Sequence, residues 1–471
     1  MIATVLGPLD ASIITGSCCS REELLHRVSP ATMKALHDNP ITLANLAEIR
    51  SCGDSGRLAA SNRLFSLDEI VQELASLKDG SDLVVLVLEC SAVVDGRDPS
   101  GLAEISTRSG VSIVMAASAK ETDLTTCSTT TRPSPETIGK GLEHQLLFGE
   151  HGSHSHSHPA TAAPNTATAP ASGAASRIQA GFILVKLYDS SSSSRSYPQH
   201  GTTTATPNAP AESALLAGCN SNIDNSIADG TAMVLEGAVK AQQATGAPLV
   251  LAFSHFVRWP AVEAALAIVA AQWGDMPDAG ASRSRQVVVA GMHGGVFQSL
   301  PDQATLLNKN KLVILCFDCF GRVEWSAGSD YHPSDEESAV RIAELVRQGF
   351  AERIVISSGV SRRIHLSRFG GHGYGHALRT VPPRLLRLGV SAEDVTLMTK
   401  ANMLRLLDWY TPPPPMEIPK DYLPCSWCQK RFEPVEGEYF HKFRFVYCGI
   451  KCLRGHRDTG FDADAVARGA V

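Results

Sequence analysis

The sequence predicts a closed (β/α)8 barrel followed by a small, separate C-terminal unit. Short apolar runs alternate along the chain with longer amphipathic segments, which is typical of parallel strands joined by helices. The short runs are apolar on both faces, as buried parallel strands must be. Four of the cysteines form two close pairs near the C-terminus, beyond a run of prolines. The chain has 471 residues, which is too long for one ordinary core.

Eight strands are predicted, and their count favours a closed barrel over an open, doubly wound sheet. Seven come from continuous runs that are rich in β-branched residues: 83–88, 111–115, 181–185, 249–252, 287–290, 312–315 and 353–356. The eighth is expected at 11–15, ahead of the others.

Helices are expected between these strands, and the clearest starts at Ser334. Ser334 can cap the first turn and Glu337, three residues later, can close a capping box. Apolar residues then recur at helical spacing, at Ala339, Ile342 and Val346.

The domain boundaries follow from composition. We expect the barrel over residues 1–410, a Pro-rich linker at 411–420, a small module at 421–460 and a tail at 461–471. Segments of about 127–175 and 190–225 are poor in large apolar residues and are predicted to be low-complexity inserts. The first contains alternating histidines at 151–158, which could hold a metal loosely but are expected to form a solvated loop.

Charge and hydropathy exclude several classes of protein. The net charge of −6 does not favour binding to nucleic acid or to anionic lipid. No apolar run approaches the ~18–20 residues of a membrane helix, and the first residues lack the features of a signal peptide. We therefore expect a cytoplasmic protein with no nucleic-acid or membrane partner.

The cysteine pairs near the C-terminus predict a structural zinc site. Cys425 and Cys428 form a C-x-x-C knuckle, and Cys448 and Cys452 form a C-x-x-x-C motif that can open a helix. This spacing is typical of a treble-clef or ribbon-like zinc module, which is too small to fold on a core of its own. A site of three cysteines with His441 or His456 is the alternative. Such a module is expected to contact a protein partner.

Several ordered segments carry a resemblance to a known family. They include Arg97-Asp98-Pro99, Phe317-Asp318-Cys319-Phe320-Gly321, and a block from Gly349 through Ser357 that continues into 369–376. Together they resemble phosphotriesterase-related proteins over nearly all of residues 4–410. The resemblance implies a barrel with two divalent metals at its C-terminal mouth, where a metal-bound hydroxide attacks a phosphoester, lactone or related ester.

On the first and fourth strands, the aligned positions lack the metal ligands that the resemblance implies. The family's first strand ends in His-x-His, whereas this chain has Ser20 and Glu22 there, or Arg21 and Glu23 if a one-residue gap is allowed. The fourth strand should deliver a bridging glutamate or carboxylated lysine. Leu184 or Val185 takes that place, and Lys186, one residue on, is predicted to face the other side of the strand.

The remaining strands retain one plausible ligand. The fifth strand has Ala252 where a histidine is expected, with His255 in the following loop. The sixth strand presents His293 within one or two residues of the family's histidine. The eighth strand has Gly359 in place of the aspartate that binds metal and accepts a proton.

Three functions are compatible with this pattern, and no catalytic residue is assigned. We favour a catalytically inactive barrel that serves as a scaffold, with the zinc module making protein contact. The first alternative is a divergent metal-dependent hydrolase of phosphoester, lactone or carboxylic ester bonds that uses rearranged ligands. The second alternative is a small-molecule binding protein. The residual residues at the barrel mouth are Glu22, Lys186, His255 and His293.

Overall fold

The computed structural model divides the chain into two compact units, Met1–Tyr410 and Thr411–Val471. It describes these residues: 1–27, 40–52, 58, 60–64, 66–78, 85–119, 133–151, 177–187, 229–253, 259–274, 285–291, 300–322, 333–411, 422–432, 439–442 and 445–461. The predicted linker and tail lie almost entirely outside these ranges, as do His255, His293 and most of the predicted inserts.

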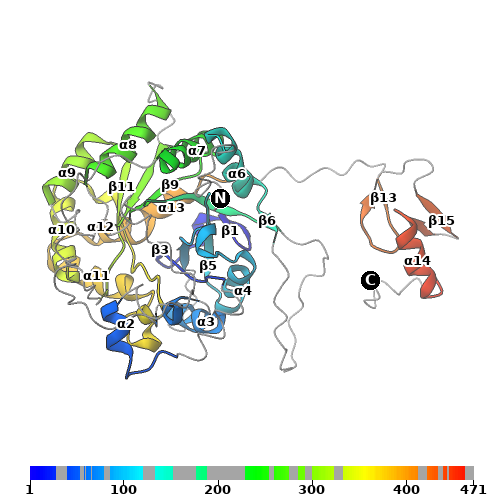
Figure 1. Cartoon of the computed structure of the whole chain (residues 1–471), viewed down its shortest axis with the longest axis horizontal. Coiled ribbons are helices and arrows are strands. Elements are labelled where there is room, and N and C mark those ends of the chain that lie inside the picture. The colour runs from blue at the N-terminus through cyan, green and yellow to red at the C-terminus, as the bar shows by residue number, and fades with distance from the viewer. Residues whose placement is uncertain are drawn as a thin grey trace, which may run out of the picture. The chain divides into compact units, whose positions relative to one another are not determined.

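The first unit contains the predicted eight-stranded parallel barrel, with an outer ring of helices around the strands (Figure 1). The strands pair in the order β12-β11-β10-β9-β8-β5-β4-β3. Their bounds are β3 (Cys18–Glu22), β4 (Leu86–Glu89), β5 (Ser112–Ala117), β8 (Ala180–Leu187), β9 (Leu249–Phe253), β10 (Val287–Ala290), β11 (Val313–Phe317) and β12 (Ile354–Ile356). All seven pairings within this order are parallel.

The first barrel strand was predicted wrongly. Residues Ala11–Ile13 form a 3-10 turn, η1, which Asp10 caps by accepting a hydrogen bond from the Ser12 amide at 2.9 Å. Ile13 is half exposed, whereas Cys18 and Cys19 are fully buried in β3. A short antiparallel pair, β1 (Ile2–Thr4) with β2 (Gly7–Leu9), precedes this turn, and β1 contacts β5 and β8.

Apolar strand residues form two layers, one inside the barrel and one between the strands and the outer helices. Alternate strand residues such as Leu88, Phe182 and Leu184 point to the barrel interior. Their neighbours, such as Val87 and Val185, pack between the strands and the helices. The interior layer extends up to the charged residues at the carboxyl ends of the strands, so the centre is a packed core.

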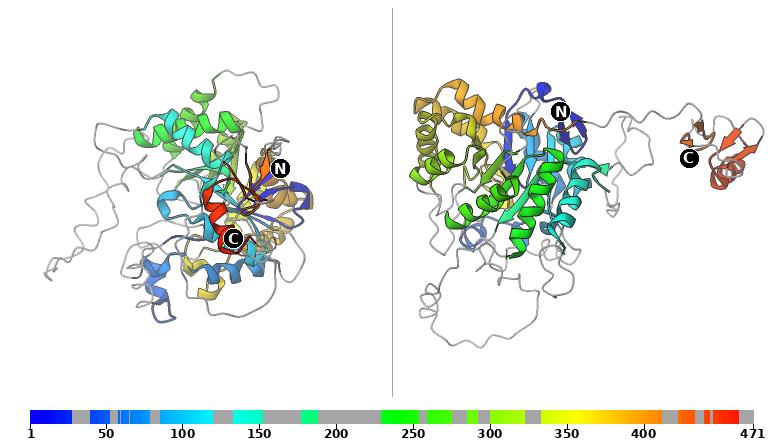
Figure 2. Two further views of the ribbon diagram at one scale, coloured as in Figure 1. Left: turned by 90° about the vertical axis from the view of Figure 1, so that its right-hand side faces the viewer. Right: turned by 90° about the horizontal axis from the view of Figure 1, so that it is seen from above.

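The helices lie on the outside of the strands, and α6 and α7 run side by side (Figure 2). Their bounds are α2 (Leu46–Cys52), α3 (Leu67–Ala75), α4 (Pro99–Ser109), α6 (Pro135–Leu147), α7 (Asp229–Thr245), α8 (Trp259–Trp273), α9 (Leu300–Lys309), α10 (Asp335–Arg347), α11 (His376–Arg387), α12 (Ala392–Thr396) and α13 (Asn402–Leu407). The described helices include none that is both long and apolar enough to cross a membrane.

Two helix starts show how local sequence sets the elements. In α10 the predicted capping box is confirmed, because Ser334 Oγ accepts from the Glu337 amide at 3.2 Å and Glu337 Oε2 accepts from the Ser334 amide at 2.7 Å. Part of the segment predicted as the first insert instead forms α6. Ser134 caps it, Pro135 occupies its first turn, and Ile138 and Leu142 lie one turn apart on its buried face.

In the second unit, the described residues form two antiparallel strand pairs and one helix. Strand β13 (Leu423–Pro424) pairs with β14 (Arg431–Phe432), and β15 (Phe440–Lys442) pairs with β16 (Phe445–Tyr447). Helix α14 (Ile450–Asp458) follows and contacts β15 and β16.

Candidate functional site

The first strand directs Arg21 and Glu23, not Ser20 and Glu22, to the barrel mouth. Its pairing with β4 shifts register between Cys19 and Glu22, which moves the inward positions by one residue. Arg21 Nη1 forms an ion pair with Asp318 Oδ2 at 2.8 Å. The other Asp318 oxygen accepts a hydrogen bond from the Gly291 amide at 3.0 Å. The carboxylate at the end of β11 therefore joins β3 to the end of β10.

Lys186 also points into the mouth, so the prediction that it faces the other side of its strand is wrong. It shares the inner face of β8 with Phe182 and Leu184, because residues two apart lie on the same side of a strand. Its Nζ donates to Glu23 Oε1 and to Asp95 Oδ2, both at 2.6 Å. The side chain is only 12% exposed.

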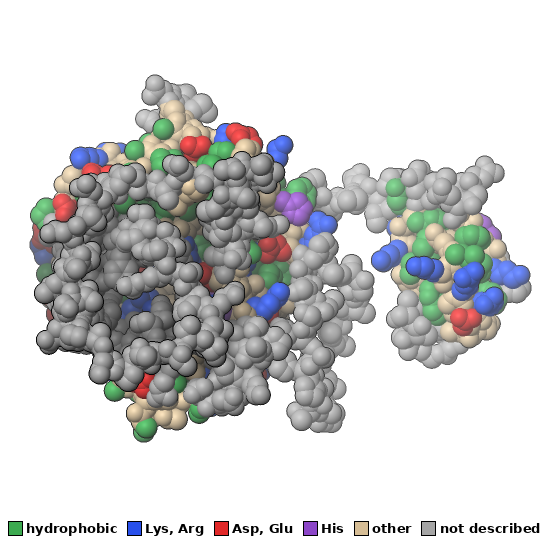
Figure 3. All heavy atoms as spheres, in the orientation of Figure 1, with side chains coloured by type: hydrophobic (Ala, Val, Ile, Leu, Met, Phe, Trp, Pro, Cys, Tyr) green, Lys and Arg blue, Asp and Glu red, His purple; other side chains and the backbone are tan. Residues whose placement is uncertain are grey.

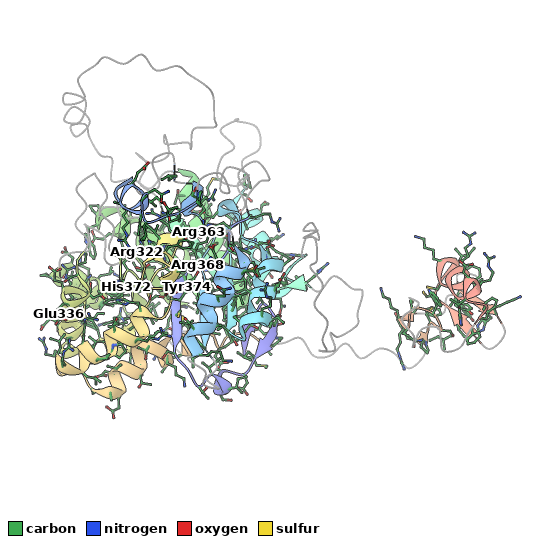
Figure 4. The ribbon with its side chains drawn as sticks, turned by 90° about the horizontal axis from the view of Figure 1, so that it is seen from below. Arg322, Glu336, Arg363, Arg368, His372 and Tyr374 are labelled. Atoms are coloured by element: carbon green, nitrogen blue, oxygen red, sulfur yellow. The ribbon has the colours of Figure 1, made fainter. Side chains whose placement is uncertain are left out.

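Glu23 is held in its ionised form by these neighbours. Burial favours the neutral carboxyl, but Lys186, His26 and Arg21 together outweigh it, so the pKa of Glu23 lies well below its usual value. His26 Nε2 lies 3.3 Å from Glu23 Oε2. Tyr374, which is labelled in Figure 4, donates from its Oη to the Glu23 carbonyl oxygen at 2.8 Å. This hydrogen bond fixes the backbone at the same point.

Glu22 points away from the mouth, into the seam between the first and last strands. One of its oxygens accepts from the Ser357 hydroxyl at 2.6 Å and the Ser358 amide at 3.0 Å, and the other accepts from the Val360 amide at 2.6 Å. Burial raises the pKa of Glu22 to about 7, against the effect of these hydrogen bonds. These hydrogen-bond partners all lie in the segment directly after the last strand.

The eighth strand offers no acid or base at the aligned position. Gly359 has a φ of +64°, and an added Cβ would overlap the Asp318 carbonyl oxygen. The Arg322 guanidinium donates to the Gly359 carbonyl oxygen. On the fifth strand, Ala252 is buried in the barrel interior. His255 and His293 themselves lie outside the described residues.

Asp318, Asp95 and Tyr374 were not predicted as mouth residues. Asp318 lies in the segment that carries the family resemblance, directly after a buried strand, and Asp95 follows β4 within a few residues. Carboxylates just beyond the carboxyl ends of barrel strands are the signal that could have found both.

A second buried carboxylate gives a testable pH dependence. Glu89 Oε1 accepts from the Leu24 amide at 3.4 Å and the Ser91 amide at 3.0 Å, and burial raises the pKa of Glu89 to about 7. Because the folded state favours the neutral acid, Glu89 contributes stability below pH ~4.5 that is lost as the pH rises through ~7. The loss amounts to about 3 kcal/mol at most.

Glu89→Gln keeps an acceptor for both amides and removes this titration. We expect the variant to match the wild type near pH 4.5 and to exceed it in free energy of unfolding by about 1–3 kcal/mol at pH 8. Chemical denaturation at several pH values measures the difference. A difference that stays constant with pH would show that Glu89 does not titrate in this window.

In the second unit, four cysteines converge. The sulfur atoms of Cys425, Cys428, Cys448 and Cys452 all lie within 4.8 Å of one another. Cys428 Sγ and Cys448 Sγ are 3.7 Å apart, and Cys448 Sγ and Cys452 Sγ are 3.6 Å apart. The knuckle after β13 supplies the first two, the turn between β16 and α14 supplies Cys448, and the first turn of α14 supplies Cys452. Four thiolates at this spacing fit a tetrahedral Zn²⁺ ion.

The alternative with a histidine ligand does not match the geometry. His456 is buried, and its Nδ1 lies 3.0 Å from Tyr447 Oη among the rings of Phe445, Trp427 and Phe461. His441 is exposed on β15. Within the described ranges, the four cysteines are the only group of three or more ligand-type side chains close enough to share an ion.

Comparison with known proteins agrees with both units. Residues 211–407 match the model of the Phosphotriesterase family, and residues 420–464 match that of the Vms1-associating treble clef domain. An N-acetyltaurine hydrolase from Tetraodon nigroviridis is 30% identical over 173 residues, which cover 36% of this chain and 46% of that protein. A phosphotriesterase-related protein from Aedes aegypti is 32% identical over 116 residues, 24% of this chain and 32% of that protein. The chain thus spans less than half the length of these relatives.

Solved structures share the fold. A resiniferatoxin-binding protein from Rhodobacter sphaeroides superposes with a TM-score of 0.60 at 22% identity, covering 86% of this chain and 94% of that one. The phosphotriesterase homology protein from Escherichia coli gives a TM-score of 0.53 at 19% identity, covering 84% and 99%. The chain is thus similar to the Phosphotriesterase family over residues 211–407 and to the Vms1-associating treble clef domain over residues 420–464, and the solved structures show the barrel fold.

Proposed function

We propose that the barrel is a scaffold without hydrolase activity and that the treble clef domain contacts a protein partner. The observation that carries this proposal is Gly359, which stands where the resemblance implies the proton-accepting aspartate. Its positive φ and its contact with the Asp318 carbonyl leave no room for a side chain. Ester hydrolysis by this family's chemistry needs a base at that point and a metal held by about three protein ligands.

The residues at the mouth do not fit a pair of divalent metals. Glu23 and Asp95 each lie 2.6 Å from the Lys186 ammonium, and Asp318 is paired with Arg21. Their oxygens are already neutralised by side-chain cations, so we derive no reaction step through a barrel metal.

The treble clef domain is proposed to hold one zinc ion and to bind a protein. Four converging thiols supply the ligands, and the metal would supply most of the folding free energy of so small a unit. Lys and Arg side chains gather on its visible face (Figure 3). Lys451, Arg454 and Arg457 are exposed on α14, which favours a partner with an acidic surface.

An activity screen tests the scaffold proposal. We expect no turnover above the metal-free control when the protein is loaded with zinc, manganese or cobalt and given aryl phosphotriesters, lactones, aryl esters or N-acetyltaurine. The reason is the missing base together with the missing ligands. Metal-dependent turnover that His293→Ala abolishes would contradict the proposal and establish the rearranged hydrolase.

That hydrolase is the second candidate, and the relatives' names favour it. Three of the matching proteins, from Tetraodon nigroviridis, Dictyostelium discoideum and Salmo salar, are named N-acetyltaurine hydrolase. If the barrel were active, amide hydrolysis would join ester hydrolysis as a reaction to test. His255 and His293 would then be the ligands to examine first.

A further inference from the structure

Two side-chain cations occupy the barrel mouth in contact with carboxylates from separate strands. We infer that Arg21 and Lys186 have taken over the charge-balancing role of resident metal ions, so that the mouth is an internally neutralised ion-pair network from which divalent cations are excluded. This inference concerns the same site as the proposed function, but it rests on side-chain geometry and is tested by stability and metal binding.

The charges in the network are nearly balanced. Lys186 Nζ lies 2.6 Å from Glu23 Oε1 and 2.6 Å from Asp95 Oδ2, while Arg21 Nη1 lies 2.8 Å from Asp318 Oδ2. Each of the three carboxylates therefore has a cation at contact distance. A divalent ion bound by Glu23 and Asp95 would lie within a few ångströms of the ammonium, and such charges repel strongly in a partly buried site. Protonated Lys186 and a metal are mutually exclusive there.

The network also joins strands that are not neighbours in the pairing order. Lys186, from β8, reaches residues that follow β3 and β4, and Arg21, from β3, reaches the end of β11. Four of the five participating side chains are largely buried: Lys186 and Glu23 are 12% exposed, Arg21 is 16% exposed and Asp318 is fully buried, whereas Asp95 is 24% exposed. At this depth, removal of one partner leaves an uncompensated charge and is strongly destabilising.

The test uses the full-length chain and compares two lysines in ion pairs. Lys186→Met leaves Glu23 and Asp95 without their cation, and we expect the unfolding equilibrium constant to rise about 100-fold or more. The control, Lys240→Met, breaks an exposed pair with Glu136 and should change that constant by less than about fivefold. Lys186→Arg retains the charge and should recover part of the loss.

Metal dependence separates charge balance from simple packing. Wild-type stability should not change with added Mn²⁺, whereas Mn²⁺ should stabilise Lys186→Met, because its free carboxylates then bind the ion in the folded state. If Lys186→Met does not fold, the Lys186→Met/Glu23→Gln double variant, which has one uncompensated carboxylate fewer, should recover a folded state with a measurable unfolding transition.

Two results would overturn the inference. One is stoichiometric Mn²⁺ binding in equilibrium dialysis by a full-length variant in which only the treble clef cysteines are replaced and the barrel residues are unchanged. The other is equal destabilisation by Lys186→Met and Lys240→Met. Neither result depends on a hydrolase assay, so this inference and the scaffold proposal can fail independently.

Discussion

Replacing Cys425 with serine is expected to reduce the zinc content of the protein from one ion per chain to none and to unfold the C-terminal unit. Three thiolates cannot complete the tetrahedral site, and structural zinc contributes about 10–16 kcal/mol of apparent binding free energy in modules of this kind. The unit has few buried apolar residues to replace it: Cys425 and Tyr447 are its only buried hydrophobic side chains among the described residues. Metal analysis and limited proteolysis of the full chain measure both effects.

His441→Ala is the matched control for this experiment. His441 lies on β15 of the same unit and is exposed, so its removal should leave zinc content and protease resistance unchanged. Loss of zinc in His441→Ala, or retention of zinc and protease resistance in Cys425→Ser, would contradict the assignment of four cysteine ligands.

Placing a side chain at Gly359 is expected to destabilise the barrel by at least about 3 kcal/mol. The residue has φ of +64°, which costs an L-residue about 1–2 kcal/mol, and an added Cβ would also overlap the Asp318 carbonyl oxygen. Gly359→Ala measures this cost, and Gly359→Asp, which restores the family's aspartate, should be at least as unstable and should not gain hydrolase activity. Chemical denaturation and the metal-loaded activity screen are the readouts.

Gly389→Ala separates backbone strain from steric overlap. Gly389 also has a positive φ, of +85°, but nothing lies within 4 Å of an added Cβ. Its replacement should cost about 1 kcal/mol. Equal costs at the two glycines would mean that the backbone at Gly359 shifts freely, and the argument that this position is closed to an aspartate would then fail.

The sequence was sufficient to predict elements whose signal is local. Seven barrel strands were found because they are apolar on both faces, and the cysteine cluster was found because its ligands come in close pairs. The first strand was missed because β3 ends in Arg21 and Glu22, which hydropathy alone does not assign to a buried strand. Their burial becomes favourable only through Asp318 and Ser357, more than 290 residues later in the chain.

The site was harder to predict than the fold for the same reason. Whether Lys186 faces the mouth depends on a register of one residue, and the pattern around it did not fix that register. Asp95 and Asp318 gain their role from partners on other strands, so their position beyond the ends of barrel strands was the one local signal that marked them. Arg21 and Glu23 align with the family's His-x-His only if a one-residue gap is allowed. The shifted pairing of β3 with β4 is the structural reason for that gap.

The seam between β3 and β12 has a consequence for local opening. Across it, the structure records one backbone hydrogen bond just beyond the strands, from the Glu23 amide to the Val360 carbonyl, and the remaining bonds pass through the side chains of Ser357 and Glu22. By contrast, the pairs β4–β5, β8–β9, β9–β10 and β10–β11 are joined by continuous ladders. In hydrogen exchange, the Arg21, Ser358 and Val360 amides should therefore exchange through a smaller opening than amides of the central strands β9 and β10. Local opening of the barrel would therefore start at this seam and would require less free energy than unfolding of the whole sheet.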